Sequence, residues 1–258
     1  MKRSLLLCFA LFPLSLALAG GKHLEIMAPL SRQEDFQGKP QLVVERCYEE
    51  KPGKAPKLLS TSRSEFDAAG NKLRDEEVDE EEKTKETETY QYDAEGTWTG
   101  LVEQSGNSLP ITYRIFLDPA TRRIAHVDAK SKETEFYSYS EQGFEMGTIK
   151  KTASGQVIEQ TTIKRNAMNK EEHILFEEKG KKAFEISIRW SDKGFQMQEE
   201  MIFHADGGDR MVTTYEYPEV DAAGNWIVQI KKQVMHQANG ERVPMPDEIT
   251  KREIKYHP

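Results

Sequence analysis

The feature that most constrains this 258-residue chain is a recurring phrase in which a polar turn containing glycine separates two alternating segments. Clear copies occupy residues 66–71, 90–98 and 215–226. Looser copies surround Gly143, Gly155, Gly194, Gly207 and Gly240. Asp or Ser at the turn entry accepts a hydrogen bond from nearby backbone, and Gly tolerates the positive φ that closes a short hairpin. The phrase therefore predicts a succession of β-hairpins.

The segments between these turns alternate with a period of two, which is typical of half-buried strands. In residues 184–190, the apolar side chains Phe184, Ile186, Ile188 and Trp190 share one face. The acidic stretch 75–89 has a composition that suits a helix, but it lacks an apolar face, so we interpret it as a solvated hairpin. The predicted fold is all-β: an antiparallel meander of repeated β-hairpins forming a curved or partly closed sheet. The pattern leaves open whether the sheet closes into a barrel, stacks as a sandwich or stays open.

The first 19 residues have the pattern of a secretory signal peptide. Lys2 and Arg3 precede an apolar run, and Ala17 and Ala19 form a small-residue cleavage site. The apolar run is shorter than the ~20 residues that a membrane-spanning helix requires, and Pro13 interrupts it. We therefore predict export to the periplasm or the medium, with no transmembrane span after cleavage. An outer-membrane barrel is disfavoured because the chain is strongly polar throughout.

The remainder divides into a flexible leader over residues 20–40, which is poorly patterned, and a single β-repeat domain over residues 41–258. The formal charge of −8 becomes −10 when Lys2 and Arg3 are removed. This acidic balance argues against nucleic acid as a partner, because nucleic acid is bound through Lys and Arg clusters. Cys47 would be the only cysteine left after cleavage. We interpret it as a buried structural residue, with intermolecular pairing as the alternative.

Residues 90–98 and 221–226 resemble the tyrosine-aspartate (YD) repeats of the RHS class. The resemblance extends over residues 58–256, with irregular spacing, and Trp98 and Trp226 stand where that class commonly has Leu. It implies strands joined into a continuous β ribbon, as in small exported bacterial proteins built from such repeats. The toxin-delivery role of the class does not carry over, because no toxin domain follows the repeats.

Catalytic motifs are missing from the sequence. It has no Gly-x-Ser-x-Gly elbow and no phosphate-binding glycine loop, and its six histidines lack metal-ligand spacing. The acidic run 75–82 lacks the spacing of a calcium loop, so we interpret it as a solvated face. We predict no catalytic residue, no metal ligand and no cofactor.

Aromatic side chains on the predicted strands are the candidate binding residues, with core packing as the alternative role. The candidates are Tyr92, Trp98, Tyr139, Tyr217 and Trp226. The sequence favours a non-enzymatic binding or scaffold protein that contacts a protein or an envelope component. The alternatives are an immunity or inhibitor protein for an exported toxin, and a polysaccharide hydrolase whose carboxylates meet only in the fold. The oligomeric state is left open.

Overall fold

The computed structural model describes residues 21–34, 36–79, 81, 83–204 and 207–258, so the predicted signal peptide over residues 1–19 lies outside the described residues. Two short helical turns, η1 (Lys22–Glu25) and α1 (Leu30–Gln33), precede the strands. The strands are β1 (Pro40–Glu50), β2 (Lys57–Phe66), β3 (Lys72–Asp79), β4 (Thr84–Tyr92), β5 (Trp98–Ser105), β6 (Ile111–Asp118), β7 (Arg123–Asp128), β8 (Thr134–Tyr139), β9 (Glu145–Lys151), β10 (Val157–Arg165), β11 (Glu171–Glu178), β12 (Lys181–Trp190), β13 (Gln196–Phe203), β14 (Asp209–Val220), β15 (Trp226–His236), β16 (Arg242–Pro244) and β17 (Asp247–Tyr256).

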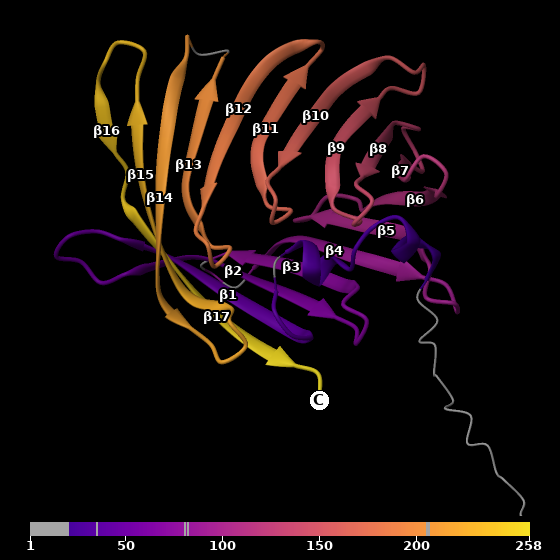
Figure 1. Cartoon of the computed structure of the whole chain (residues 1–258), viewed down its shortest axis with the longest axis horizontal. Helices are drawn as coiled ribbons and strands as arrows, with labels where there is room; N and C mark the ends of the chain where they lie inside the picture. Colours follow the sequence, from indigo (N-terminus) through magenta and orange to yellow (C-terminus); the bar gives the residue numbers. More distant parts are fainter. Residues whose placement is uncertain (1–20, 35, 80, 82, 205–206) are drawn as a thin grey trace, which may run out of the picture.

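The strands form one antiparallel meander, as the alternation predicts, and the meander closes on itself (Figure 1). Each strand pairs with the next along the chain up to β15, which pairs with both the short β16 and β17. β17 then pairs with β1 from Pro40↔Tyr256 to Glu50↔Asp247. This closure corrects the expectation of a curved or partly closed sheet. Alternation along a strand is the same in open and closed sheets, whereas closure depends on the twist and stagger that all strands accumulate together.

The glycine-centred phrases are chain reversals, as predicted. In the β2–β3 turn, the Gly70 N–H donates to the Asp67 carbonyl at 3.0 Å and the Asp67 N–H donates to the Asn71 carbonyl at 2.9 Å. The Asp67 carboxylate also accepts the N–H groups of Ala69 and Asn71, while Gly70 has a φ of +87°. The same pair of backbone bonds recurs in the turns that begin at Asp93, Ser140, Thr152, Asn166, Ser191, Asp221 and Gln237.

The strands run alternately up and down as far as β15, so the connections from even-numbered to odd-numbered strands between β2 and β15 lie at one end of the barrel. We call it the capped end, since residues 21–39, the N-terminal segment, run across it. Hydrogen bonds join this segment to three turns spaced around the barrel: Ala28 N–H donates to the Gly143 carbonyl at 2.8 Å and Ser31 N–H to the Gly70 carbonyl at 3.1 Å, and Gln37 N–H donates to Asn225 Oδ1 at 2.7 Å. Figure 1 shows α1 lying between the strands of the opposite walls.

The ordered packing of this segment differs from the flexible leader expected over residues 20–40. Ile26 and Met27 are buried against Trp98, Leu101 and Ile124 of the barrel. The segment has no periodic pattern, because its apolar residues fill gaps between turns and do not face a regular sheet. No helix among the described residues is long and apolar enough to cross a membrane.

Candidate binding cavity

Aromatic side chains next to the turns line the interior of the capped end, and their anchoring repeats around the barrel. The Tyr92 hydroxyl, just before the β4–β5 turn, donates to the Lys72 carbonyl on β3 at 2.7 Å. The Tyr217 hydroxyl on β14 donates to the Gln196 carbonyl on β13 at 2.8 Å. Both tyrosines thus bond to the first residue of the preceding strand. This repetition follows from the repeated phrase, which places an aromatic ring at the same point of several hairpins.

In one half of the barrel the N-terminal segment covers these rings. Trp98 on β5 is 5% exposed and Tyr139 on β8 is 9% exposed, and both pack in one cluster with Ile26 and Met27. His23 of η1 accepts the backbone N–H of Trp98 at Nδ1, 3.1 Å away, and its Nε2 lies 3.1 Å from Asn71 Oδ1. Burial lowers the pKa of His23, which keeps the ring neutral so that it can serve as both acceptor and donor.

In the other half the corresponding rings are half-buried and face a cavity of about 830 Å³. Phe195 and Tyr217 stack there with ring centroids 4.9 Å apart, and Trp226 lies 6.1 Å from Tyr217. The Nε1 of Trp190 donates to the Glu171 carbonyl at 2.6 Å, which fixes the fourth ring. Polar side chains complete the lining: Glu34, Gln37, Lys170, Asp192, Lys193, Gln196, Asn225, Gln229 and Arg252.

Arg252 on β17 holds the N-terminal segment to one wall of the cavity. Its guanidinium lies 3.4 Å from the Trp226 ring centroid and 4.8 Å from that of Phe36. The Arg252 Nε donates to Glu45 Oε1 at 2.6 Å, and NH2 lies 2.5 Å from the same oxygen. Stacking and a charge-assisted pair together fix the guanidinium, because its planar form satisfies both kinds of contact at once.

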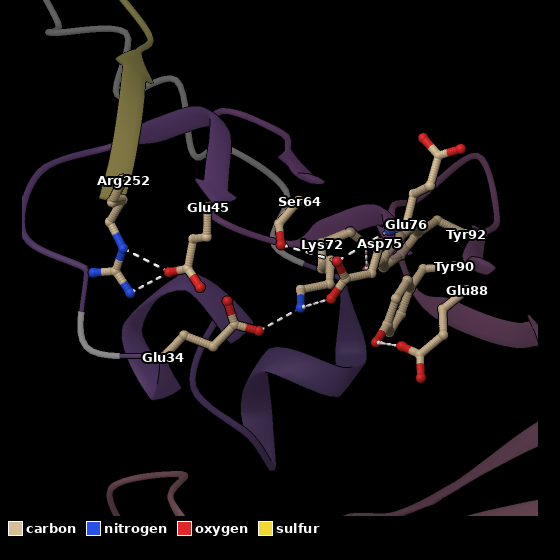
Figure 2. A network of polar contacts seen from close by, with 10 residues as sticks. All are labelled: Glu34, Glu45, Ser64, Lys72, Asp75, Glu76, Glu88, Tyr90, Tyr92 and Arg252. Carbon is tan, nitrogen blue, oxygen red and sulfur yellow. Dashed lines mark hydrogen bonds and ion pairs between the residues drawn. The ribbon is translucent and has the colours of Figure 1, made fainter. Parts of the chain in front are cut away.

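A second ion-pair network fixes the segment at α1 (Figure 2). The buried Lys72 ammonium lies 2.5 Å from a Glu34 oxygen and 2.6 Å from an Asp75 oxygen. These two carboxylates raise the pKa of Lys72 despite its burial, whereas burial raises the pKa of Glu34 against the pull of the lysine. Figure 2 shows the two networks side by side, with Arg252–Glu45 on one flank of α1 and Lys72 on the other.

Carboxylates also line the interior away from the cavity, paired with tyrosines. The Tyr90 hydroxyl donates to Glu88 at 2.6 Å, and the Tyr137 hydroxyl donates to Glu135 at 2.9 Å. Burial and the nearby Glu171 raise the pKa of Glu145 to about 7. Within the described ranges, no group of three or more His, Cys, Asp or Glu side chains is placed to hold a metal ion.

The five candidate binding residues from the sequence divide between the two halves. Tyr217 and Trp226 line the cavity. Trp98 and Tyr139 are buried under the N-terminal segment, and Tyr92 packs against the same cluster. The aromatic candidates in the covered half thus pack in the core, which is the alternative role. For Tyr217 and Trp226 in the open half, a binding role stays a prediction.

Sequence reasoning missed Phe195 and Arg252 among the lining residues. Phe195 follows Gly194 in a looser copy of the repeated phrase, so its place next to a turn was a usable signal. No local pattern marks Arg252, since its role depends on β17 lying beside β1 and on Phe36 crossing the capped end.

Comparisons with known proteins leave the chain without a family. No model of a known protein family matches it, and no curated protein matches it. Among solved structures, a porin-like protein from Bacteroides uniformis shares 13% identity at a TM-score of 0.36, covering 85% of this chain and 99% of that one. A protein from Lactobacillus plantarum shares 9% identity at a TM-score of 0.12, with 83% and 99% coverage. Structural similarity at these TM-scores supports no conclusion about the fold or the function of this chain.

Proposed function

We propose that this chain is an exported binding protein that holds a small amphipathic ligand from the cell envelope in the cavity at its capped end. One observation carries the proposal. Equivalent rings are covered by Ile26 and Met27 in one half of the barrel, whereas Trp190, Tyr217 and Trp226 remain half-buried around a cavity in the other half. The sequence pattern of a signal peptide over residues 1–19 supports export.

Covering this aromatic surface with a ligand is favourable in free energy. Each 100 Å² of apolar surface removed from water contributes roughly 2.5 kcal/mol, before the entropic cost of association. The cavity volume of about 830 Å³ falls within the roughly 300–1,000 Å³ of small-molecule sites, and aromatic walls with a few polar groups are typical of them. The rings are already anchored through Trp190 Nε1 and the Tyr217 hydroxyl, so little ordering cost remains.

The hydrolase alternative has one observation in its favour, because two carboxylates, Glu34 and Asp192, line the same cavity. Glu34, however, is ion-paired with Lys72 at 2.5 Å and serves to hold α1. Binding without chemistry therefore explains the lining better. The immunity or inhibitor alternative stays a prediction from the acidic composition.

Native mass spectrometry of the mature chain, incubated with a small-molecule extract of the bacterial envelope, tests the proposal. We expect a bound mass on the parent chain and its loss in Met168→Trp, which places a bulky ring at the cavity rim. Met168 is 45% exposed, so the substitution should not affect folding. The control is Phe116→Ala, at a 55% exposed ring of β6 outside the cavity lining. If Met168→Trp retains the bound mass to the same extent as the parent chain, the proposal is contradicted.

A further inference from the structure

The cavity lining also specifies a class of ligand. We infer that the cavity accepts a short, uncharged oligosaccharide. This inference rests on the proposed function and deepens it, because it names what the aromatic cavity would bind. Three independent features of the lining carry it: the state of its charged groups, the hydrogen bonding of its amides and the arrangement of its rings.

Two charged groups of the lining have partners of opposite sign, and a third, the Lys170 ammonium, lies 5.3 Å from the Trp190 ring centroid. Arg252 is paired with Glu45 at 2.5 Å, and Glu34 is paired with Lys72 at 2.5 Å. At the rim, Asp192 and Lys193 are adjacent and exposed, and they carry opposite charges. A charged ligand would have to compete with these internal pairs or enter without a counter-charge, and either is costly in a partly desolvated site. The lining therefore favours a ligand without net charge.

Two glutamine side chains of the lining are each held by one hydrogen bond within the protein. The Gln196 Nε2 donates to Glu199 at 3.0 Å, and the Gln229 Nε2 donates to the Tyr217 hydroxyl at 3.2 Å. Each amide thus uses one N–H group within the protein, so its second N–H group and its carbonyl oxygen can bond to a ligand. Such amides match the hydroxyl groups of sugars, each of which can both donate and accept a hydrogen bond.

The rings and the size of the cavity complete the match. Sugars present flat C–H faces as well as hydroxyls, and these faces pack on aromatic rings such as Trp190, Phe195 and Tyr217. A volume of about 830 Å³ accommodates a few sugar rings and excludes a long chain from lying fully inside. The exposed rim at Met168 and Val220 gives access from solvent.

Tryptophan fluorescence and calorimetric titration of the mature chain with size-matched probes test this inference. The uncharged probes are maltotriose, cellotriose and N-acetylated chitotriose. The charged probes are trigalacturonate and fully deacetylated chitotriose, and an end-capped neutral tripeptide serves as a non-sugar probe. We expect at least one uncharged trisaccharide to bind, and each charged trisaccharide and the tripeptide to bind at least tenfold more weakly.

Variants then locate the binding. Gln229→Leu should weaken binding of the uncharged sugar at least tenfold, because it removes a hydrogen-bonding amide from the lining at almost constant size, and Met168→Trp should weaken it similarly. The matched control is Gln104→Leu, at an exposed glutamine of β5, which should leave binding unchanged. Failure of every uncharged trisaccharide to bind, or binding that Gln229→Leu does not alter, overturns the oligosaccharide inference.

The outcomes separate this inference from the proposed function. If the tripeptide or a charged probe binds best and Met168→Trp abolishes that binding, the cavity is a ligand site of another class. If no probe binds, and Met168→Trp still retains the bound mass from the envelope extract, both the oligosaccharide inference and the proposed function fail.

Discussion

At the scale of single residues, His126 on β7 shows how the fold can assign a role that its residue type does not suggest. Its ring centroid lies 4.4 Å from that of Tyr137 and 4.9 Å from that of Trp98, so it packs as an aromatic core residue. Its Nε2 is buried without a hydrogen-bond partner. Burial lowers the pKa of His126 to about 4, because charging the ring there would require desolvating an ion with no counter-charge.

This shift predicts a loss of stability in acid. The unfolded chain protonates His126 near its ordinary pKa of 6.5, whereas the folded chain resists protonation until about pH 4. The unfolded state therefore binds the proton preferentially, and stability falls as the pH drops from 6.5 toward 4. We expect the difference in unfolding free energy between His126→Phe and the parent to shift in favour of His126→Phe by about 2 kcal/mol when the pH is lowered from 7.5 to 4.5. Urea unfolding at the two pH values measures this shift.

His236→Phe provides the comparison for this prediction, since His236 lies half-buried on β15, outside the core clusters. It controls for the replacement of a histidine by phenylalanine away from the buried ring cluster. A His126→Phe protein whose stability changes with pH as steeply as that of the parent would show that His126 titrates normally in the folded chain.

At the scale of elements, the N-terminal segment depends on turns that serve two purposes. Gly70 and Gly155 have the same φ of +87° in equivalent turns, so a side chain strains the backbone equally at both. A Cβ at Gly155 would meet open space, whereas a Cβ at Gly70 would collide with Ser31 Oγ of α1. The Gly70 turn thus reverses the chain and also gives α1 room to approach.

The two glycines make a matched pair for testing how the segment docks. Gly155→Ala should cost about 1 kcal/mol of stability from backbone strain alone. Gly70→Ala should cost more and should also release the segment, seen as faster proteolytic cleavage within residues 21–39. Equal stability losses with equal protection of the segment would mean that the segment does not rest on the Gly70 turn.

At the scale of the whole molecule, closure depends on the pairing of the first and last strands. Cys47 on β1 lies directly opposite Thr250 on β17, in a register that continues for nine residue pairs from Leu42↔Lys255 to Glu50↔Asp247. Cys47 is half-buried, and burial raises the pKa of its thiol. Directly opposed residues of antiparallel strands have Cα atoms about 4.5–5.5 Å apart, within the range that a disulfide can span.

Thr250→Cys should therefore form a disulfide with Cys47 under mild oxidation, detected as a cross-linked peptide by mass spectrometry without reduction. The bond would link the two ends of the barrel and raise its resistance to urea. Lys251→Cys is the matched control, because successive side chains along a strand point to opposite faces. It should stay reduced. Cross-linking in Lys251→Cys but not in Thr250→Cys would mean that the register is shifted, and cross-linking in neither would argue against closure.

Closure also explains how the chain avoids exposed sheet edges. In a closed ring the backbone groups of β1 and β17 bond to each other and offer no template for another chain. The many charged side chains on the outer strand faces then face solvent and are not needed to protect an edge. The consequence is a hollow interior whose two halves are filled differently.

The sequence by itself determined the hairpins and their reversals, because Asp-to-Gly turns and alternation act over a few residues. It also placed aromatic rings such as Tyr217 and Trp226 next to those turns. Only the tertiary structure decided that β17 meets β1, that Ile26 covers one half of the interior and that Arg252 and Phe195 border a cavity in the other. These contacts join residues far apart in the chain, and no local preference encodes how the strands' accumulated twist brings them together.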